Sequence, residues 1–161
     1  MDEPRDARSM LRHTLATLAY RGGKAVRGAP PEVAGFKAAA ATRTPLEILA
    51  HVGDLLDWAL ALADGRHEWH QRAPLPWEDE VARFFAGMER LDARLAGDAP
   101  LGLPAERLFQ GPIADALTHV GQISLLRRLA GSPVLGEDYS RADIEVGRVG
   151  SSQAPPPREF D

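Results

Sequence analysis

Apolar residues recur along the chain at spacings of three and four, and strict alternation of apolar and polar residues is rare. This spacing is typical of helices with one buried face. The pattern appears in four stretches, which begin near Arg5, Thr44, Pro76 and Gly111. We therefore expect an all-α protein, an antiparallel four-helix bundle with a long connection after the first helix.

Glycine, proline and capping residues mark the helix ends. The sequence Thr44-Pro-Leu-Glu47 has the clearest start signal, because it combines an N-cap threonine, proline at the first helical position and glutamate at the third. Gly22-Gly23 is expected to end the first helix, and Pro104 to Phe109 is expected to be a short turn. The expected helices run from about Arg5 to Tyr20, Thr44 to Gly65, Trp77 to Gly97 and Gly111 to Gly131.

The residues after Gly131 differ in kind from the rest, since they are rich in glycine and proline. We expect a helical domain over residues 1–131 and an irregular C-terminal tail over residues 132–161. The tail is either partly ordered or an arm packed on the bundle or on a partner subunit. The candidate anchors of such an arm are Tyr139, Ile144, Val146 and Phe160.

The composition excludes several classes of protein. The chain of 161 residues has no cysteine, so a disulfide framework and a thiolate metal site are excluded. Its formal net charge of −4, with acids and bases mixed, disfavours binding to nucleic acid. No apolar run has the length of a membrane span, and the polar start lacks the pattern of a signal peptide. These features predict a cytoplasmic protein that does not bind membranes.

Three side chains are candidates for a metal site. His51 lies on the apolar stripe of the second expected helix, between Ile48 and Leu55. Asp115 and His119 are four residues apart in the fourth, so they project from the same face one turn apart. If these two helices pack as neighbours, two imidazoles and one carboxylate converge.

Each of these groups also has a structural explanation. A single histidine among apolar residues is more often a hydrogen-bonded core residue, and an Asp–His pair at helical spacing is usually a surface pair worth about 0.2–0.5 kcal/mol. Asp115, however, is expected on a buried face. A buried carboxylate that loses its partner costs about 3–5 kcal/mol, and a bound cation would remove that cost.

Other chemistry-bearing residues are weaker candidates. His67-Glu-Trp-His70 lacks the four-residue spacing that places two histidines on one helical face, and we expect it in a surface loop. Asp54, one turn from His51, is a candidate catalytic base or an acceptor that orients the histidine; a solvated position is the alternative. Trp58 is expected in the core or beside the metal.

The region from Thr44 to Gly131 resembles the DinB/YfiT-like superfamily. His119-Val-Gly-Gln-Ile123, followed by Leu-Leu-Arg-Arg, is similar to the last core helix of that family. The sequence from Thr44 to His51, with Trp58 further on, is similar to its second helix and first metal ligand. The resemblance implies a four-helix bundle, commonly dimeric, with a metal held by three histidines. His51 and His119 match two of them, whereas Asp115 stands where the middle histidine is expected.

Two functions remain open at this point. The first is a divalent-metal-dependent enzyme with His51, Asp115 and His119 as ligands, a set that suits Zn, Ni, Fe or Mn. An open position on the metal could serve hydrolysis or thiol transfer. The resemblance favours thiol transfer and implies a homodimer, and the substrate would be a small molecule such as a low-molecular-weight thiol. The second is a non-catalytic, stress-associated binding or scaffold protein in which the metal is structural or absent.

Overall fold

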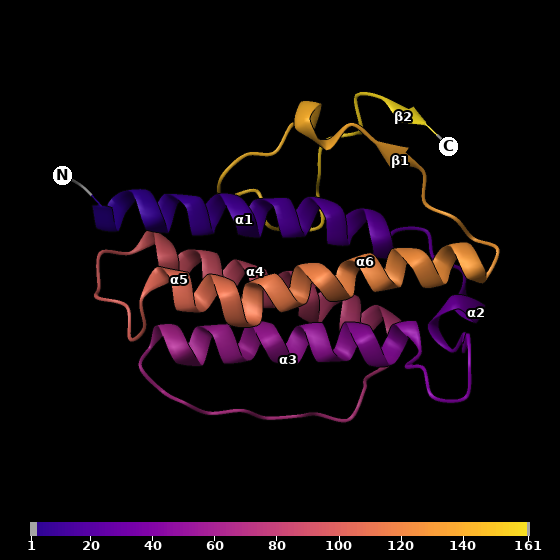
Figure 1. Cartoon of the computed structure of the whole chain (residues 1–161), viewed down its shortest axis with the longest axis horizontal. Coiled ribbons are helices and arrows are strands. Elements are labelled where there is room, and N and C mark those ends of the chain that lie inside the picture. The colour runs from indigo at the N-terminus through magenta and orange to yellow at the C-terminus, as the bar shows by residue number, and fades with distance from the viewer. Residues whose placement is uncertain (1–2, 161) are drawn as a thin grey trace.

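The computed structural model describes residues 3–160 and is predominantly helical, which confirms the all-α prediction (Figure 1). Four helices of the described chain are long, and the strands are short. None of these helices has both the length and the apolar character needed to cross a membrane. The elements are α1 (Glu3–Val26), α2 (Pro31–Ala34), α3 (Pro45–Ala63), α4 (Trp77–Ala96), α5 (Ala105–Leu108), a π-type turn (Phe109–Ile113), α6 (Ala114–Leu129), β1 (Gly136–Glu137), a 3₁₀ turn (Tyr139–Arg141) and β2 (Glu159–Phe160).

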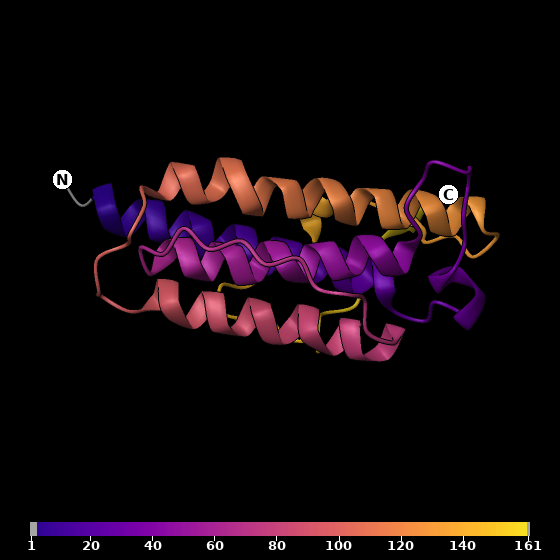
Figure 2. The same cartoon turned by 90° about the horizontal axis from the view of Figure 1, so that it is seen from below.

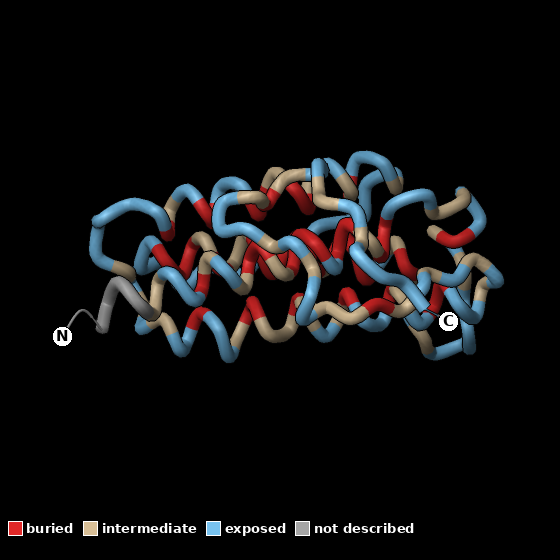
Figure 3. Tube along the Cα trace, turned by 90° about the horizontal axis from the view of Figure 1, so that it is seen from above, coloured by how far each residue is buried: buried red, intermediate tan, exposed pale blue. Residues whose placement is uncertain are grey.

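The four long helices pack on one another around a single apolar core. Helix α1 contacts α4 and α6, and α3 contacts the same two helices. Buried positions lie on the inward sides of the helices, and exposed positions face outward (Figure 3). The three- and four-residue spacing produces this arrangement, because it places the apolar side chains of each helix on one stripe. The most deeply buried side chains include Leu15, Leu18, Leu56, Phe84, Met88 and Leu91.

Helices α3 and α4 run in the same direction. Asp54 of α3 pairs with Arg83 of α4, and further along both helices Asp64 pairs with Arg94. Partner numbers that increase together along two helices require parallel axes. Figure 1 accordingly shows α1 and α6 running one way and α3 and α4 the other. The prediction of an antiparallel arrangement is therefore wrong for α3 and α4.

Parallel neighbours need a long crossover, and residues 64–76 provide it. Helix α3 has 19 residues, so it is about 28 Å long at 1.5 Å per residue. A dozen extended residues can span up to about 40 Å. The segment 64–76 has no regular structure and returns along the length of α3 (Figure 2). The chain thus has a second long connection besides the expected one between α1 and α3.

Helix α1 continues to Val26 instead of ending at Gly22-Gly23. Gly22 faces the ring of Phe84, and a Cβ atom at this position would collide with the Cζ atom of that ring. The glycine therefore serves the close approach of α1 and α4, and the energy of this packing outweighs the lower helix propensity of glycine.

The segment from Pro104 to Phe109 is also helical, contrary to the prediction of a turn. It forms α5, which leads through the π-type turn into α6. Gly111 interrupts the helical geometry with a ψ angle of −106°, and Pro112 follows it. Proline lacks the N–H that an uninterrupted helix would use at this point, which accounts for the break.

The residues after Gly131 pack along α1 (Figure 1). The buried carboxylate of Glu137 accepts a hydrogen bond from the Tyr20 hydroxyl at 2.7 Å and pairs with Lys24. Strands β1 and β2 pair antiparallel over two residues each, so the segment is less irregular than predicted. Of the expected anchors, Tyr139 lies under the guanidinium of Arg21, whereas Val146 and Phe160 are exposed.

Candidate metal centre

His51 is positioned by the capped start of α3. Thr44 accepts a hydrogen bond from the backbone N–H of Glu47, and the Glu47 side chain accepts one from the N–H of Thr44. This is the predicted capping box. Because the first turn is held in this way, His51 lies nearly two turns into the helix at the edge of its buried stripe, beside the buried residues Ile48 and Leu55.

Asp115 and His119 come from the first turns of α6. Nδ1 of His119 lies 2.8 Å from the backbone carbonyl oxygen of Asp115 and 3.2 Å from its Oδ1 atom. A carbonyl oxygen only accepts hydrogen bonds, so we assign the proton to Nδ1. This tautomer leaves the lone pair on Nε2, available to a metal ion, and the backbone contact holds the ring in its orientation.

The three side chains meet where α3 packs on α6. One potential ligand atom from each lies within 4.8 Å of the others. Nε2 of His51 is 3.7 Å from Oδ2 of Asp115, and the rings of His51 and His119 have centroids 4.7 Å apart. Zinc bonds of about 2.0–2.2 Å would place tetrahedral ligand atoms roughly 3.4 Å apart. The three residues therefore converge to nearly the separation that a bound ion requires.

The cluster lies at the edge of the helix interface and not inside the core. The side chains of His51, His119 and Asp115 are 21, 13 and 47% exposed. The expectation that Asp115 occupies a buried face is wrong. Because water solvates this carboxylate, no bound cation is needed to offset its burial, and that argument for a metal no longer applies. The support for a metal site is the convergence of three ligands beside open space.

The environment of His51 favours its neutral form. Burial, the neighbouring His119 and the positive charge of Arg43 lower the pKa of His51, against the opposing effect of Asp115 and Asp54. A metal ion binds the neutral imidazole. The local field therefore prepares His51 to act as a ligand without competition from a proton at neutral pH.

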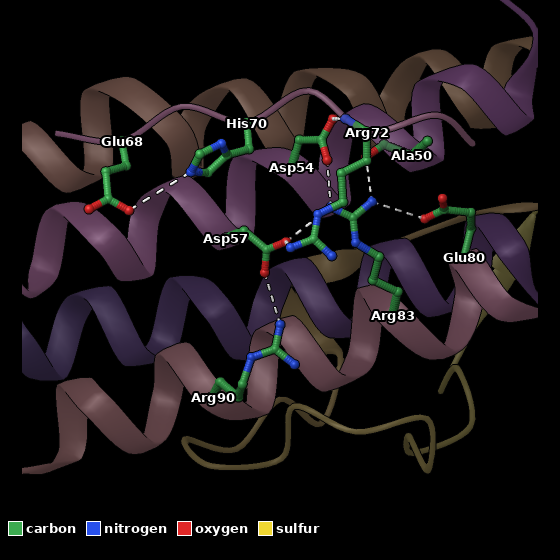
Figure 4. A network of polar contacts seen from close by, with 9 residues as sticks. All are labelled: Ala50, Asp54, Asp57, Glu68, His70, Arg72, Glu80, Arg83 and Arg90. Carbon is green, nitrogen blue, oxygen red and sulfur yellow. Dashed lines mark hydrogen bonds and ion pairs between the residues drawn. The ribbon is translucent and has the colours of Figure 1, made fainter. Parts of the chain in front are cut away.

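Asp54 is buried and faces α4. Its Oδ1 accepts a hydrogen bond from the guanidinium of Arg83, and its Oδ2 accepts one from the backbone N–H of Arg72 at 3.2 Å (Figure 4). Arg83 also bonds Asp57, while its Nε atom is buried without a partner. Within residues 3–160, no hydrogen bond joins Asp54 to His51. The assignment of Asp54 as a base or an orienting residue stays a prediction.

Trp69 is a neighbour of the cluster that the sequence did not reveal. It lies in the crossover of residues 64–76, and its ring meets that of His51 edge-on with centroids 5.8 Å apart. Trp58 of α3 also contacts the Trp69 ring, with centroids 5.7 Å apart. The sequence drew attention to His67 and His70 instead. As predicted, both are exposed in a loop, and neither belongs to the cluster.

Two cavities open beside the histidine pair. One, of about 330 Å³, is lined by His51, Asp54 and Trp69 among others. The second, of about 500 Å³, is lined by His119 and Gln122 among others. Arg43, in the loop before α3, lines both cavities. The arrangement can therefore hold a divalent ion by three groups and place a small molecule next to it.

Comparison with known proteins adds no relative to this description. No protein-family model matches the chain, and neither a curated protein nor a solved structure matches it.

Proposed function

We propose that this chain is a divalent-metal-dependent enzyme of the DinB/YfiT-like superfamily, of the thiol transferase or hydrolase type. The observation that carries the proposal is the meeting of His51, Asp115 and His119, each with a potential ligand atom within 4.8 Å of the others. The matching sequence features around His51 and His119 support the family assignment.

The packing of the long helices supports the corresponding architecture. Helices α1 and α3 each contact both α4 and α6. We infer that these helices form a four-helix bundle, with α3 and α4 parallel. In such bundles, metal sites are built from side chains of facing helices, which is how the ligands of this chain are distributed.

The donor set fits a divalent ion. Two imidazoles and one carboxylate suit Zn, Ni, Fe or Mn, and three protein ligands leave at least one coordination position open. A bound ion of this kind supplies Lewis-acid chemistry, which makes a water molecule or a thiol more acidic. The substrate would then be a small molecule, such as a low-molecular-weight thiol.

The residues around the proposed metal ion have different roles. His51 and His119 would bind through ring nitrogens, and the half-exposed Asp115 leaves one side of the site accessible. The half-exposed Trp69 packs edge-on against the ring of His51 and also contacts Trp58. Asp54 remains the candidate base, although its two oxygens already accept hydrogen bonds from Arg83 and Arg72. We further propose a homodimer that works in the cytoplasm.

Metal analysis tests the proposal directly. Protein purified without a histidine tag should contain a divalent ion by elemental analysis, or bind Zn²⁺ with one-to-one stoichiometry. The variant His51→Ala should lose it. The matched control is His70→Ala, because His70 is exposed in the crossover, where it lies 3.8 Å from Glu68, and does not belong to the cluster. Metal content unaffected by His51→Ala would contradict the site. Protein that binds no divalent ion would favour a non-catalytic binding or scaffold role.

A further inference from the structure

The carboxylates that line the cavity beside His51 already have partners within the chain. Asp54 accepts hydrogen bonds from Arg83 and from the backbone N–H of Arg72. The Glu47 side chain accepts a hydrogen bond of 2.7 Å from the backbone N–H of Thr44, as part of the capping box. Both carboxylates therefore accept hydrogen bonds from the protein, Asp54 through both oxygens and Glu47 through Oε2.

The arginines that line this cavity differ in this respect. Nη2 of Arg72 lies 3.6 Å from Oδ2 of Asp57, so Arg72 has an acidic neighbour. Arg43 is exposed, and no carboxylate of residues 7–160 forms an ion pair with it. Its backbone directly precedes the capped first turn of α3, which gives the side chain a fixed base. Of the two arginines that line the cavity, Arg43 is thus the one whose guanidinium forms no ion pair with residues 7–160.

Arg43 also lies between the two cavities and lines both of them. One cavity reaches His51 and the other reaches His119. A molecule that approaches the histidine pair from either cavity therefore passes the same arginine. In the first cavity, the positive charges of Arg43 and Arg72 are accompanied by the negative charges of Glu47 and Asp54. In the second cavity, Arg43 contributes a positive charge beside His119.

We propose that Arg43 binds a carboxylate of the substrate, so that the substrate class is a small thiol or ester that also carries a carboxylate group. This inference rests on the proposed metal-dependent function, since the reacting end of the molecule must lie at His51 and His119. A guanidinium fork matches a carboxylate with two parallel hydrogen bonds, and a single positive charge balances a single negative one. Arg43 acts by holding the substrate and takes no part in proton transfer.

Two probes that differ only in charge test this role. The Zn²⁺-loaded protein is titrated by calorimetry with 3-mercaptopropionate and with 3-mercaptopropionamide, which offer the same thiol to the metal. The carboxylate should bind about tenfold more tightly, as expected for a charge-assisted hydrogen bond at an accessible site. Arg43→Gln should remove most of this preference and leave Zn²⁺ stoichiometry unchanged.

Arg128→Gln is the matched control. Arg128 is also exposed and makes no ion pair with residues 7–160, but it lines neither cavity beside the histidines. This variant removes the same charge and should keep the full preference. Equal affinity of the wild type for both probes would overturn the proposal. A preference retained in Arg43→Gln, or lost equally in Arg128→Gln, would overturn it as well.

The experiment distinguishes an error in the proposed metal site from an error in the proposed role of Arg43. Titration of metal-free protein with propionate and propionamide, followed by NMR, measures the carboxylate preference without any metal. A protein that binds no Zn²⁺ but prefers propionate through Arg43 would contradict the proposed function and support the carboxylate site. A protein that binds Zn²⁺ but prefers neither probe would support the proposed function and contradict the carboxylate site.

Discussion

The rings of His51 and His119 lie side by side where α3 contacts α6, with centroids 4.7 Å apart and planes tilted by 59°. The neighbouring His119 is one of the causes that lower the pKa of His51. Two imidazoles at this separation are suited to share a cation. Asp115, one turn from His119, supplies the negative charge that such a cation would attract.

Asp115 is the residue on which the ligand set depends most. Asp115→Asn removes the charge and leaves a poorer ligand, so Zn²⁺ affinity should fall at least about tenfold. Asp115→His offers a third imidazole at the same position and should retain tight binding. Both are measured by competition with a chromogenic chelator. The control Asp98→Asn removes an exposed charge from the loop after α4. Unchanged affinity in Asp115→Asn would exclude the carboxylate from the site.

The lowered pKa of His51 predicts how stability depends on pH. The folded protein binds the His51 proton less readily than the unfolded chain, whose histidine pKa is about 6.5. As pH falls below about 6.5, the unfolded state takes up this proton first, so the free energy of unfolding decreases until pH reaches the lowered folded pKa.

Urea unfolding of metal-free protein between pH 7.5 and 5 measures this effect. One proton changes the free energy of unfolding by at most about 1.4 kcal/mol per pH unit. Other groups titrate in the same range, so the test compares slopes. His51→Gln should show a smaller loss of stability on acidification than the wild type does. Identical slopes would mean that the surroundings of His51 do not disfavour its charged form.

Arg83 is expected to be essential for stability. It pairs with the buried Asp54 and also contacts Asp57 and Glu80 (Figure 4). Arg83→Met would leave buried carboxylates without their cation, and we expect a loss of about 3–5 kcal/mol in the free energy of unfolding. Arg90→Met is the control, because Arg90 is half exposed and pairs with Asp57 at the surface. It should cost less than about 1 kcal/mol.

Chemical denaturation monitored by circular dichroism would measure these two changes in the free energy of unfolding. A similar effect of both substitutions would show that Arg83 is not a buried counter-ion. If Arg83→Met does not fold, the double variant Arg83→Met with Asp54→Leu removes the unpaired charge and should recover part of the stability.

The sequence by itself determined the four long helices, apart from the end of α1, and part of the site. Local signals sufficed for the capped start of α3, since Thr44 and Glu47 interact within one turn. They also sufficed for the shared face of Asp115 and His119, because helical geometry places residues four apart side by side. The end of α1 was misjudged, because the packing of Gly22 against Phe84 is not visible in local propensity.

Only the tertiary structure decided how these parts meet. The distance between His51 and His119 depends on the packing of α3 on α6, and the exposure of Asp115 depends on where that interface ends. The parallel course of α3 and α4 forces the crossover of residues 64–76 back along α3, which brings Trp69 to His51. Contacts between residues far apart in the chain depend on helix order and direction. The periodicity of a single helix carries information about neither, since the same buried stripe can pack in several topologies.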